Sequence, residues 1–382
     1  MNIFFSYVPF QYLFLFTKAI FFILAIKVLD PSLYSDLVKS NIVVAYVSFI
    51  GFGINNSIAL FSNHKNMQKY IDLVSRYAYI LGLFLSTSVI YVWTQNLGIS
   101  IFTGSIYLLT NLSHNFKQKL NHYFASISFI LLSLLYFLIY LFFYFNLEQF
   151  VSFTVFLSLI ISIIFLLRTT KFKKITFFKK VFKHGINRGM PLFLNGFFYQ
   201  GLISFDLILV SFIYDEFFYI YAFYQSLFVA ILGFTNILSE YIFISLCKYD
   251  SLSELKSRAE KSFLILALAR IFIFIVVLIF SGFIFDLFFK EISSYKTIFF
   301  IFWASFLVQT LGIGGGALAN ILGKGWLYTK IILYCALINL VTNLVIYLLG
   351  LNFVYYAFSA FISFFCLGVM SFVLYNSLIK KI

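Results

Sequence analysis

The stretch RTTKFKKITFFKKVFKHGINR, residues 168–188, carries eight of the 27 lysines and arginines of the chain. On both sides of it the sequence is a series of apolar runs interrupted by short polar breaks. The chain of 382 residues is 63% hydrophobic and only 10% charged, whereas a soluble globular protein carries about 25% charged residues. The composition therefore predicts a protein that crosses a membrane many times.

Each apolar run is long enough to cross a bilayer as a helix, which takes about 20 predominantly apolar residues. No connection between the runs is long enough to hold a soluble domain. The predicted spans are residues 6–28, 38–62, 72–93, 97–113, 122–145, 149–168, 189–213, 217–246, 261–286, 295–321, 328–350 and 354–378. The predicted fold class is thus an all-α polytopic membrane protein with about twelve transmembrane helices.

The basic residues predict the orientation of these spans. If the N-terminus is cytoplasmic, 21 of the 27 basic residues fall in cytoplasmic segments, four fall outside, and Lys18 and Arg270 lie within spans. Cytoplasmic loops are enriched in lysine and arginine, so both termini are expected in the cytoplasm. The net charge of +14 then follows from topology and gives no reason to expect a nucleic-acid partner.

The basic stretch also divides the chain into two halves. We predict a six-helix lobe over residues 1–168, a basic cytoplasmic linker over 169–188 and a second six-helix lobe over 189–382. KVLDPSLYSDLVKSNIV after the first span is similar to SFIYDEFFYIYAFYQSLFV after the seventh, which suggests a duplication. Parallel repeats of this kind place a substrate site near the bilayer midplane between the halves.

Three stretches spread over the chain carry a family resemblance. They are AIKVLDPSLYSDLVKSN, KHGINRGMPLFLNGFFYQGLISFDLILVSFIYDEFFYIYAFYQSLF and ANILGKGWLYTKIILYCALINLVTNLVIYLLGL. They resemble the multidrug/oligosaccharidyl-lipid/polysaccharide exporter (MOP) superfamily, which includes the MATE exporters, and within it most the O-antigen flippases called Wzx. At two turns where that family often has glycine, this chain has Ser35 and Tyr219.

The resemblance implies a V-shaped pair of six-helix lobes around a central cavity, and transport by alternating access. It also implies a substrate that is an oligosaccharide carried on a polyprenyl diphosphate. The charged and polar side chains inside the predicted spans give an indication of the substrate that is independent of this resemblance.

Two cations lie deep in predicted spans, where a charge costs about 3 kcal/mol or more on insertion scales. Lys18 has Gln11 seven residues earlier on the same helix face, and Arg270 lies about nine residues into the ninth span. Either could bind the diphosphate of the substrate, arginine through paired hydrogen bonds. The alternatives are that the side chains reach an interface, or that Arg270 forms an ion pair with Asp206.

Asp206 is the one carboxylate well inside a span, and Asn195 should lie on the same face of that helix. Asp206 could bind a coupling ion or compensate one of the buried cations. The eighth span carries a stripe of Gln225, Asn236 and Glu240. We predict that Asn195, Gln225 and Asn236 contact substrate and that Glu240, like Asp206, serves in ion coupling or charge compensation; interhelical hydrogen bonding is the alternative.

Other chemistry is not indicated by the sequence. The three cysteines and four histidines show no metal-ligand spacing, so we predict no metal, no cofactor and no catalytic residues. LGIGGGALANILGKGW matches neither the Rossmann nor the P-loop pattern. Its Gly312 and Gly316 form a GxxxG motif that predicts close helix packing or a flexible end of the tenth span.

The leading hypothesis is a non-enzymatic flippase for a lipid-linked oligosaccharide of O-antigen or a related surface polysaccharide. The alternatives are a multidrug or small-molecule exporter of the same fold and, less favoured, a polysaccharide polymerase or ligase. A cationic drug would favour an acidic cavity, whereas two central cations favour an anion. The expected location is the bacterial inner membrane, and the expected partners are the lipid-linked substrate, membrane lipids, and polymerase and chain-length machinery.

The orientation can be tested with reporter fusions. We expect fusions after residues 115, 180 and 250 to report the cytoplasm and fusions after 95, 147 and 215 to report the outside, because of the distribution of basic residues. An external location for residues 168–188 would contradict this topology.

Overall fold

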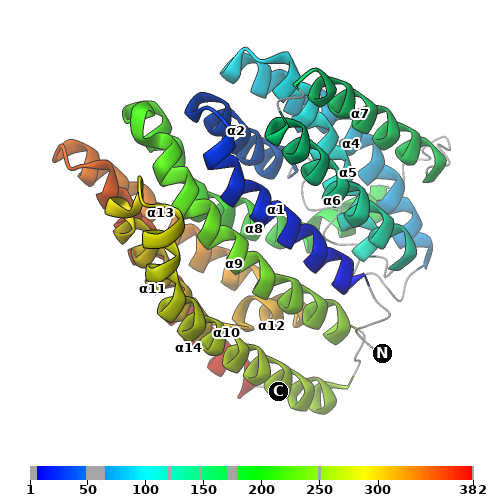
Figure 1. Ribbon diagram of the computed structural model, residues 1–382. Coiled ribbons are helices and arrows are strands. Elements are labelled where there is room, and N and C mark those ends of the chain that lie inside the picture. The colour runs from blue at the N-terminus through cyan, green and yellow to red at the C-terminus, as the bar shows by residue number, and fades with distance from the viewer. Residues whose placement is uncertain are drawn as a thin grey trace. The chain divides into compact units, whose positions relative to one another are not determined.

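A computed structural model describes residues 7–48, 65–118, 122–145, 148–169, 179–247 and 251–380. These residues form helices joined by short turns, without strands (Figure 1). The chain forms two compact units, Met1–Phe193 and Leu194–Ile382, and the boundary between them falls inside one helix, α8 (Lys179–Ile213).

The first unit packs its helices around aromatic side chains. Besides the start of α8 it contains α1 (Val8–Val28), α2 (Pro31–Val47), α4 (Lys65–Thr94), α5 (Leu97–Gln118), α6 (His122–Tyr144) and α7 (Glu148–Thr169). Helix α1 packs on α6, and α5 packs on α2, α4, α6 and α7. The ring of Tyr136 on α6 is fully buried and contacts the rings of Phe14, Phe21 and Phe102.

The second unit is built around α14. Besides the rest of α8 it contains α9 (Asp215–Leu246), α10 (Leu252–Phe288), α11 (Thr297–Leu311), α12 (Gly315–Ile321), α13 (Gly325–Leu348) and α14 (Tyr356–Ile379), with short 3₁₀ turns at Ser293–Tyr295 and Phe353–Tyr355. Helix α14 lies against α11, α12 and α13. Phe228 of α9 stacks on Phe302 of α11 and contacts Phe364 of α14, which ties the three helices together.

The helices have the length and surface of membrane spans. Within the described residues, seven helices are long and apolar enough to cross a bilayer, and the bent pair that ends in α12 can count as an eighth. Large apolar side chains such as Leu264, Leu268, Phe272 and Phe283 are exposed along α10. Such a surface is stable against lipid and not against water. The predicted all-α polytopic membrane fold is confirmed.

Several helices extend beyond the predicted spans. Helix α2 begins at Pro31 instead of residue 38, α8 begins at Lys179 within the range predicted as linker, and α10 begins at Leu252 instead of residue 261. The polar start of α10 is helical because Leu255 and Ala259 are buried in a cluster with Leu246, Phe263 and Leu266. The length of an apolar run reflects the thickness of the bilayer. A helix can extend beyond that run wherever its side chains can pack. Residues 49–62 of the second predicted span lie outside the described residues.

The tenth predicted span, 295–321, is broken. The segments Ser293–Leu311 and Gly315–Ile321 meet at 43°, and Gly314 between them has φ +89°, a conformation that favours glycine. A Cβ at Gly312 would lie 2.8 Å from the carbonyl oxygen of Gly368, and one at Gly316 would overlap the ring of Tyr328. The break and the close packing expected of the GxxxG motif therefore occur together.

The contact between α11 and α14 should tolerate no side chain at Gly368, because a Cβ there would overlap the carbonyl oxygen of Val308. We expect Gly368→Ala to lower the free energy of unfolding by about 1–3 kcal/mol, as overpacking does. The thermal unfolding midpoint of the purified protein in detergent measures this effect.

Gly282→Ala is the matched control, since nothing lies within 4 Å of a Cβ at Gly282 in α10. We expect it to be neutral or to stabilise the helix by up to about 1 kcal/mol. Equal effects of the two substitutions would contradict the packing described here.

Candidate functional site

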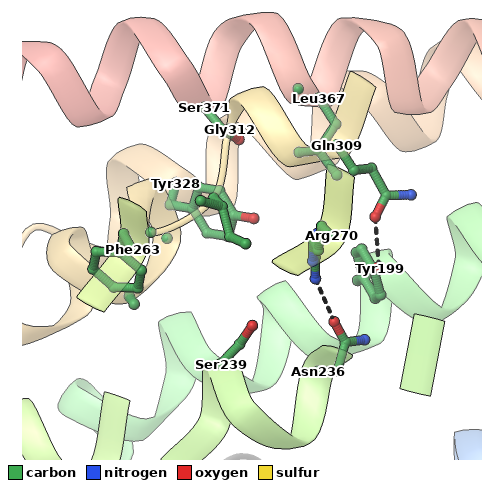
Figure 2. A pocket seen from close by; sticks show the side chains of 15 residues that line it. Tyr199, Asn236, Ser239, Phe263, Arg270, Gln309, Gly312, Tyr328, Leu367 and Ser371 are labelled. Atoms are coloured by element: carbon green, nitrogen blue, oxygen red, sulfur yellow. Dashed lines mark hydrogen bonds between the residues drawn. The ribbon is translucent and has the colours of Figure 1, made fainter. Parts of the chain in front are cut away.

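A cavity of about 260 Å³ lies inside the second unit (Figure 2). Every helix of this unit contributes to its wall: α8, α9, α10, α11, α12, α13 and α14, together with the glycine break. The lining residues are Tyr199, Asn236, Ser239, Phe263, Arg270, Gln309, Gly312, Ile313, Gly314, Gly316, Ala317, Tyr328, Leu367, Gly368 and Ser371. The glycines matter to the cavity because they bring the backbone of the broken helix to its wall.

Arg270 is the charged residue of the cavity wall. It is the middle residue of α10, about 27 Å along the helix from either end, and only 5% of it is exposed. Its Nη2 donates a hydrogen bond to Oδ1 of Asn236 at 2.9 Å, and its guanidinium lies 5.5 Å from the ring centroid of Phe306. The Nε of Arg270 has no hydrogen-bond partner among the described residues.

Among the described residues, no neighbouring acid neutralises the positive charge of Arg270. The lining contains no aspartate or glutamate, and among the described residues no ion pair includes Arg270. An isolated charge in a low-dielectric interior is destabilising by several kcal/mol; removing one partner of a buried pair, for example, costs about 3–5 kcal/mol. Water or an anion in the cavity is the remaining means of stabilising the guanidinium.

Gln309 and Tyr199 also line the cavity, and no sequence pattern indicates a role for Tyr199. The hydroxyl of Tyr199 donates to Oε1 of Gln309 at 3.3 Å, as Figure 2 shows. The Nε2 of Gln309 has no partner among the described residues, although Gln309 is only 8% exposed. The chain has 27 tyrosines, so the presence of Tyr199 in the sequence does not by itself indicate a functional residue. Gln309, a polar residue in an apolar span three residues before Gly312, is expected from the sequence either to line a cavity or to form an interhelical hydrogen bond.

The cavity lies toward the basic end of the unit. Phe263 follows Lys261 by two residues, and Tyr328 lies between Lys324 and Lys330. These three lysines are exposed. The field of such a group raises the local concentration of anions, so the end of the unit nearest the cavity favours negatively charged molecules.

Asp206 belongs to a different cluster. It is fully buried, its Oδ2 accepts a hydrogen bond from the hydroxyl of Tyr221 at 2.6 Å, and its Oδ1 accepts one from Nε2 of Gln225 at 3.2 Å. Gln225 also donates to the backbone carbonyl of Ile203. Among the described residues, Asp206 forms no ion pair with Arg270. On α9, Gln225 lies eleven residues from Asn236, or about 16 Å along the helix.

The structure therefore separates residues that the sequence placed on one stripe. Asn236 lines the cavity, Gln225 contacts Asp206, and Glu240 is half-buried and is not among the lining residues. Asn195 on α8 is 7% exposed, and neither atom of its amide group has a partner among the described residues. Asn195 is not part of the cavity wall.

Lys18 lies in the first unit, on α1. It is half-buried, and its Nζ is 5.9 Å from the ring centroid of Tyr136. Among the described residues no ion pair includes Lys18, and Oε1 of Gln11 has no hydrogen-bond partner. Within the described part of the chain, Lys18 thus contacts an aromatic face, an interaction worth about 0.5–2 kcal/mol, and no carboxylate.

Within the part of the chain that the structure describes, no group of three or more histidine, cysteine, aspartate or glutamate side chains converges to bind a metal ion. The polar groups that line the cavity are an arginine, amides and hydroxyls. Such groups bind an anion or a hydroxylated molecule by hydrogen bonds.

Comparison with known proteins identifies the fold. A scan of protein-family models found no match, and a search of curated proteins also found none. Solved structures do match over nearly the whole chain. An outward-facing multidrug resistance MATE family transporter of the MOP superfamily aligns with TM-score 0.68 and 11% identity, covering 98% of this chain and 95% of that one. The chain has the MATE/MOP transporter fold.

Two further structures with this fold align similarly. A point mutant of a MATE transporter gives TM-score 0.67 at 12% identity, with 98% and 96% of the chains covered. A MOP superfamily transporter from Pyrococcus furiosus gives TM-score 0.67 at 11% identity, with 98% and 94% covered. At this identity the likeness concerns the MATE/MOP fold alone, and what the chain transports must be inferred from its own residues.

The separation of Asp206 from Arg270 can be tested with double-mutant cycles on the stability of the purified protein. We expect Asp206→Asn and Tyr221→Phe to be coupled by about 0.5 kcal/mol or more, on the order of values for residues in contact. We expect Asp206→Asn and Arg270→Gln to be additive within about 0.5 kcal/mol. Strong coupling in the second cycle would show that the two charges interact.

Proposed function

We propose that this protein is a flippase that moves a polyprenyl-diphosphate-linked oligosaccharide, such as a repeat unit of O-antigen or a related surface polysaccharide, across a membrane. The observation that carries the proposal is Arg270, a buried guanidinium in a cavity without a carboxylate, in a chain with the fold of exporters. The substrate is chosen by charge complementarity with this residue.

A lipid diphosphate presents about two negative charges, and moving them through a bilayer without compensation is strongly unfavourable. A fixed cation in the membrane reduces that cost, while the anion in turn stabilises the buried cation. Lys18 is a second intramembrane cation without a carboxylate partner among the described residues. We assign Lys18 and Arg270 to binding of the diphosphate, with Asn236 supporting Arg270.

Asn195 and Gln225 complete the predicted set of substrate contacts, and Asp206 is proposed for ion coupling. The hydrogen-bond partners of Asp206 on α9 are the neutral side chains Tyr221 and Gln225, so a proton or a monovalent cation could neutralise its carboxylate. Glu240, nearer the end of α9, is a weaker candidate for the same role. The chain has no nucleotide-binding motif, and an ion gradient, the membrane potential or consumption of the product would supply the energy.

Transport would proceed by alternating access in the bacterial inner membrane, with both termini in the cytoplasm. The distribution of basic residues supports this orientation. The lipid-linked substrate and membrane lipids would be the direct partners. Polymerase and chain-length machinery would use the exported repeat unit on the other side of the membrane.

A MATE-like multidrug or small-molecule exporter is the second candidate, because solved structures with this fold include multidrug transporters. The transporter from Pyrococcus furiosus is described as having a binding pocket of reverse polarity that suggests a different function, so polarity is a criterion within the fold. The cavity of this chain has a cation and no acid among its lining residues, which favours an anionic substrate over a cationic drug.

The proposal predicts the phenotype of cation variants in a flippase-deleted host that displays surface glycan. We expect Lys18→Ala and Arg270→Gln to reduce surface glycan at least tenfold, because the diphosphate loses its counter-charge. Lys18→Arg should retain part of the activity, because it keeps the charge and changes the geometry. Surface glycan is measured by staining, and the membrane abundance of each variant is measured in parallel.

Arg258→Gln is the matched control, because Arg258 is exposed near the start of the same helix as Arg270. It should export glycan normally. Normal surface glycan with both Lys18→Ala and Arg270→Gln at equal abundance would reject the flippase proposal. Drug efflux that depends on the same residues would then favour the multidrug exporter.

A further inference from the structure

The hydrogen bonds of the cavity leave an excess of donors. The amide oxygen of Asn236 already accepts from Arg270, and the amide oxygen of Gln309 already accepts from Tyr199. Three buried polar groups in the wall remain without a partner among the described residues: Nε of Arg270 and Nε2 of Gln309, which can only donate, and Oγ of Ser371, which can donate or accept. A buried donor without a partner costs about 1–3 kcal/mol, so the cavity is complementary to a molecule that accepts hydrogen bonds.

Charge narrows the chemistry of that molecule further. Arg270 contributes a full positive charge, and none of the lining residues is acidic. Arginine binds the oxygens of phosphate groups through charge-assisted hydrogen bonds. At neutral pH the oxygens of a phosphate group act almost entirely as hydrogen-bond acceptors. A sugar hydroxyl, in contrast, carries a proton of its own and therefore also needs an acceptor.

The size of the cavity indicates how much of a substrate it can take. Pockets for drug-sized ligands measure about 300–1,000 Å³, and this cavity, at about 260 Å³, lies just below that range. It can hold a phosphate or a diphosphate, but not an oligosaccharide repeat unit with its lipid.

We propose that the cavity inside the second unit is a phosphate subsite in which Arg270 and Gln309 bind the oxyanion and Asn236 and Tyr199 position them. This inference deepens the proposed function, on which its assignment to a lipid diphosphate rests. Asn236 fixes the guanidinium through Nη2, so that Nε stays free. Tyr199 fixes the amide of Gln309 with its oxygen engaged, so that the NH₂ group stays free.

Asn236→Asp is the decisive variant, because it is isosteric and places a carboxylate against Arg270. We expect inorganic pyrophosphate to bind the purified full-length protein, and Asn236→Asp to weaken that binding at least tenfold. The same variant should raise the thermal unfolding midpoint, because the new carboxylate neutralises a buried charge. Gln309→Glu should act in the same way, whereas Tyr199→Phe should weaken binding severalfold. Isothermal titration calorimetry measures the affinities.

Asn352→Asp is the matched control. Asn352 is exposed, and its side-chain oxygen caps a 3₁₀ turn by accepting from the backbone N–H of Val354, a role that aspartate fills equally well. It should change neither pyrophosphate affinity nor the unfolding midpoint. Absence of pyrophosphate binding to the wild type, or unchanged binding to Asn236→Asp, would overturn the subsite.

Two further measurements separate this inference from the proposed function. Farnesyl diphosphate should compete with pyrophosphate in the wild type while farnesol does not, if the subsite receives a lipid headgroup. Binding of pyrophosphate without competition by farnesyl diphosphate supports the subsite and assigns it to free phosphate compounds instead. Loss of pyrophosphate binding in Asn236→Asp together with normal glycan export would uphold the subsite and count against the flippase.

Discussion

The desolvated guanidinium of Arg270 is the constraint around which the second unit is arranged. Toward the end of α10 the next charged residue is Asp286, and toward its start the nearest is the exposed Lys261, nine residues or about 14 Å along the helix, so the guanidinium lies well inside the helix on both sides. The unit provides an amide oxygen from Asn236 and the face of Phe306, which are neutral groups. Neutral groups reduce the desolvation penalty without removing the charge. The cavity beside Arg270 is therefore part of what makes its burial possible.

The wall of that cavity depends on the break in the tenth span. The chain bends by 43° between Ser293–Leu311 and Gly315–Ile321, with Gly314 in a positive-φ conformation between them, and α12 lies against α14. The glycines at the break let α11 and α12 approach α14 and the ring of Tyr328 closely. Small residues are the usual means of close helix approach in membranes, where the hydrophobic effect does not drive helices together. Aromatic contacts among Phe228, Phe302 and Phe364 hold the rest of the unit at the same time.

The second unit keeps its acid and its cation in separate environments. Asp206 and its partners Tyr221 and Gln225 form one cluster, while Arg270 and Asn236 form another about 16 Å further along α9. A direct ion pair would have satisfied both charges and left neither available. Because the hydrogen-bond partners of Asp206 and of Arg270 are neutral side chains, each can respond to an external ion. This separation is consistent with the proposal that Arg270 binds an anion and Asp206 a coupling ion.

The sequence alone determined the fold class. In a bilayer the backbone polar groups of a spanning segment must be hydrogen-bonded within that segment, and a long apolar run therefore specifies a helix. The sequence also pointed to Lys18, Arg270 and Asp206, since an ionisable residue in an apolar run stands out in one dimension. The tertiary structure decided the rest: which partners Arg270 and Asp206 have, that Tyr199 and Gln309 join the cavity, and that the tenth span is broken. Contacts between helices depend on the rotation and crossing of each helix, and apolar composition encodes neither of these.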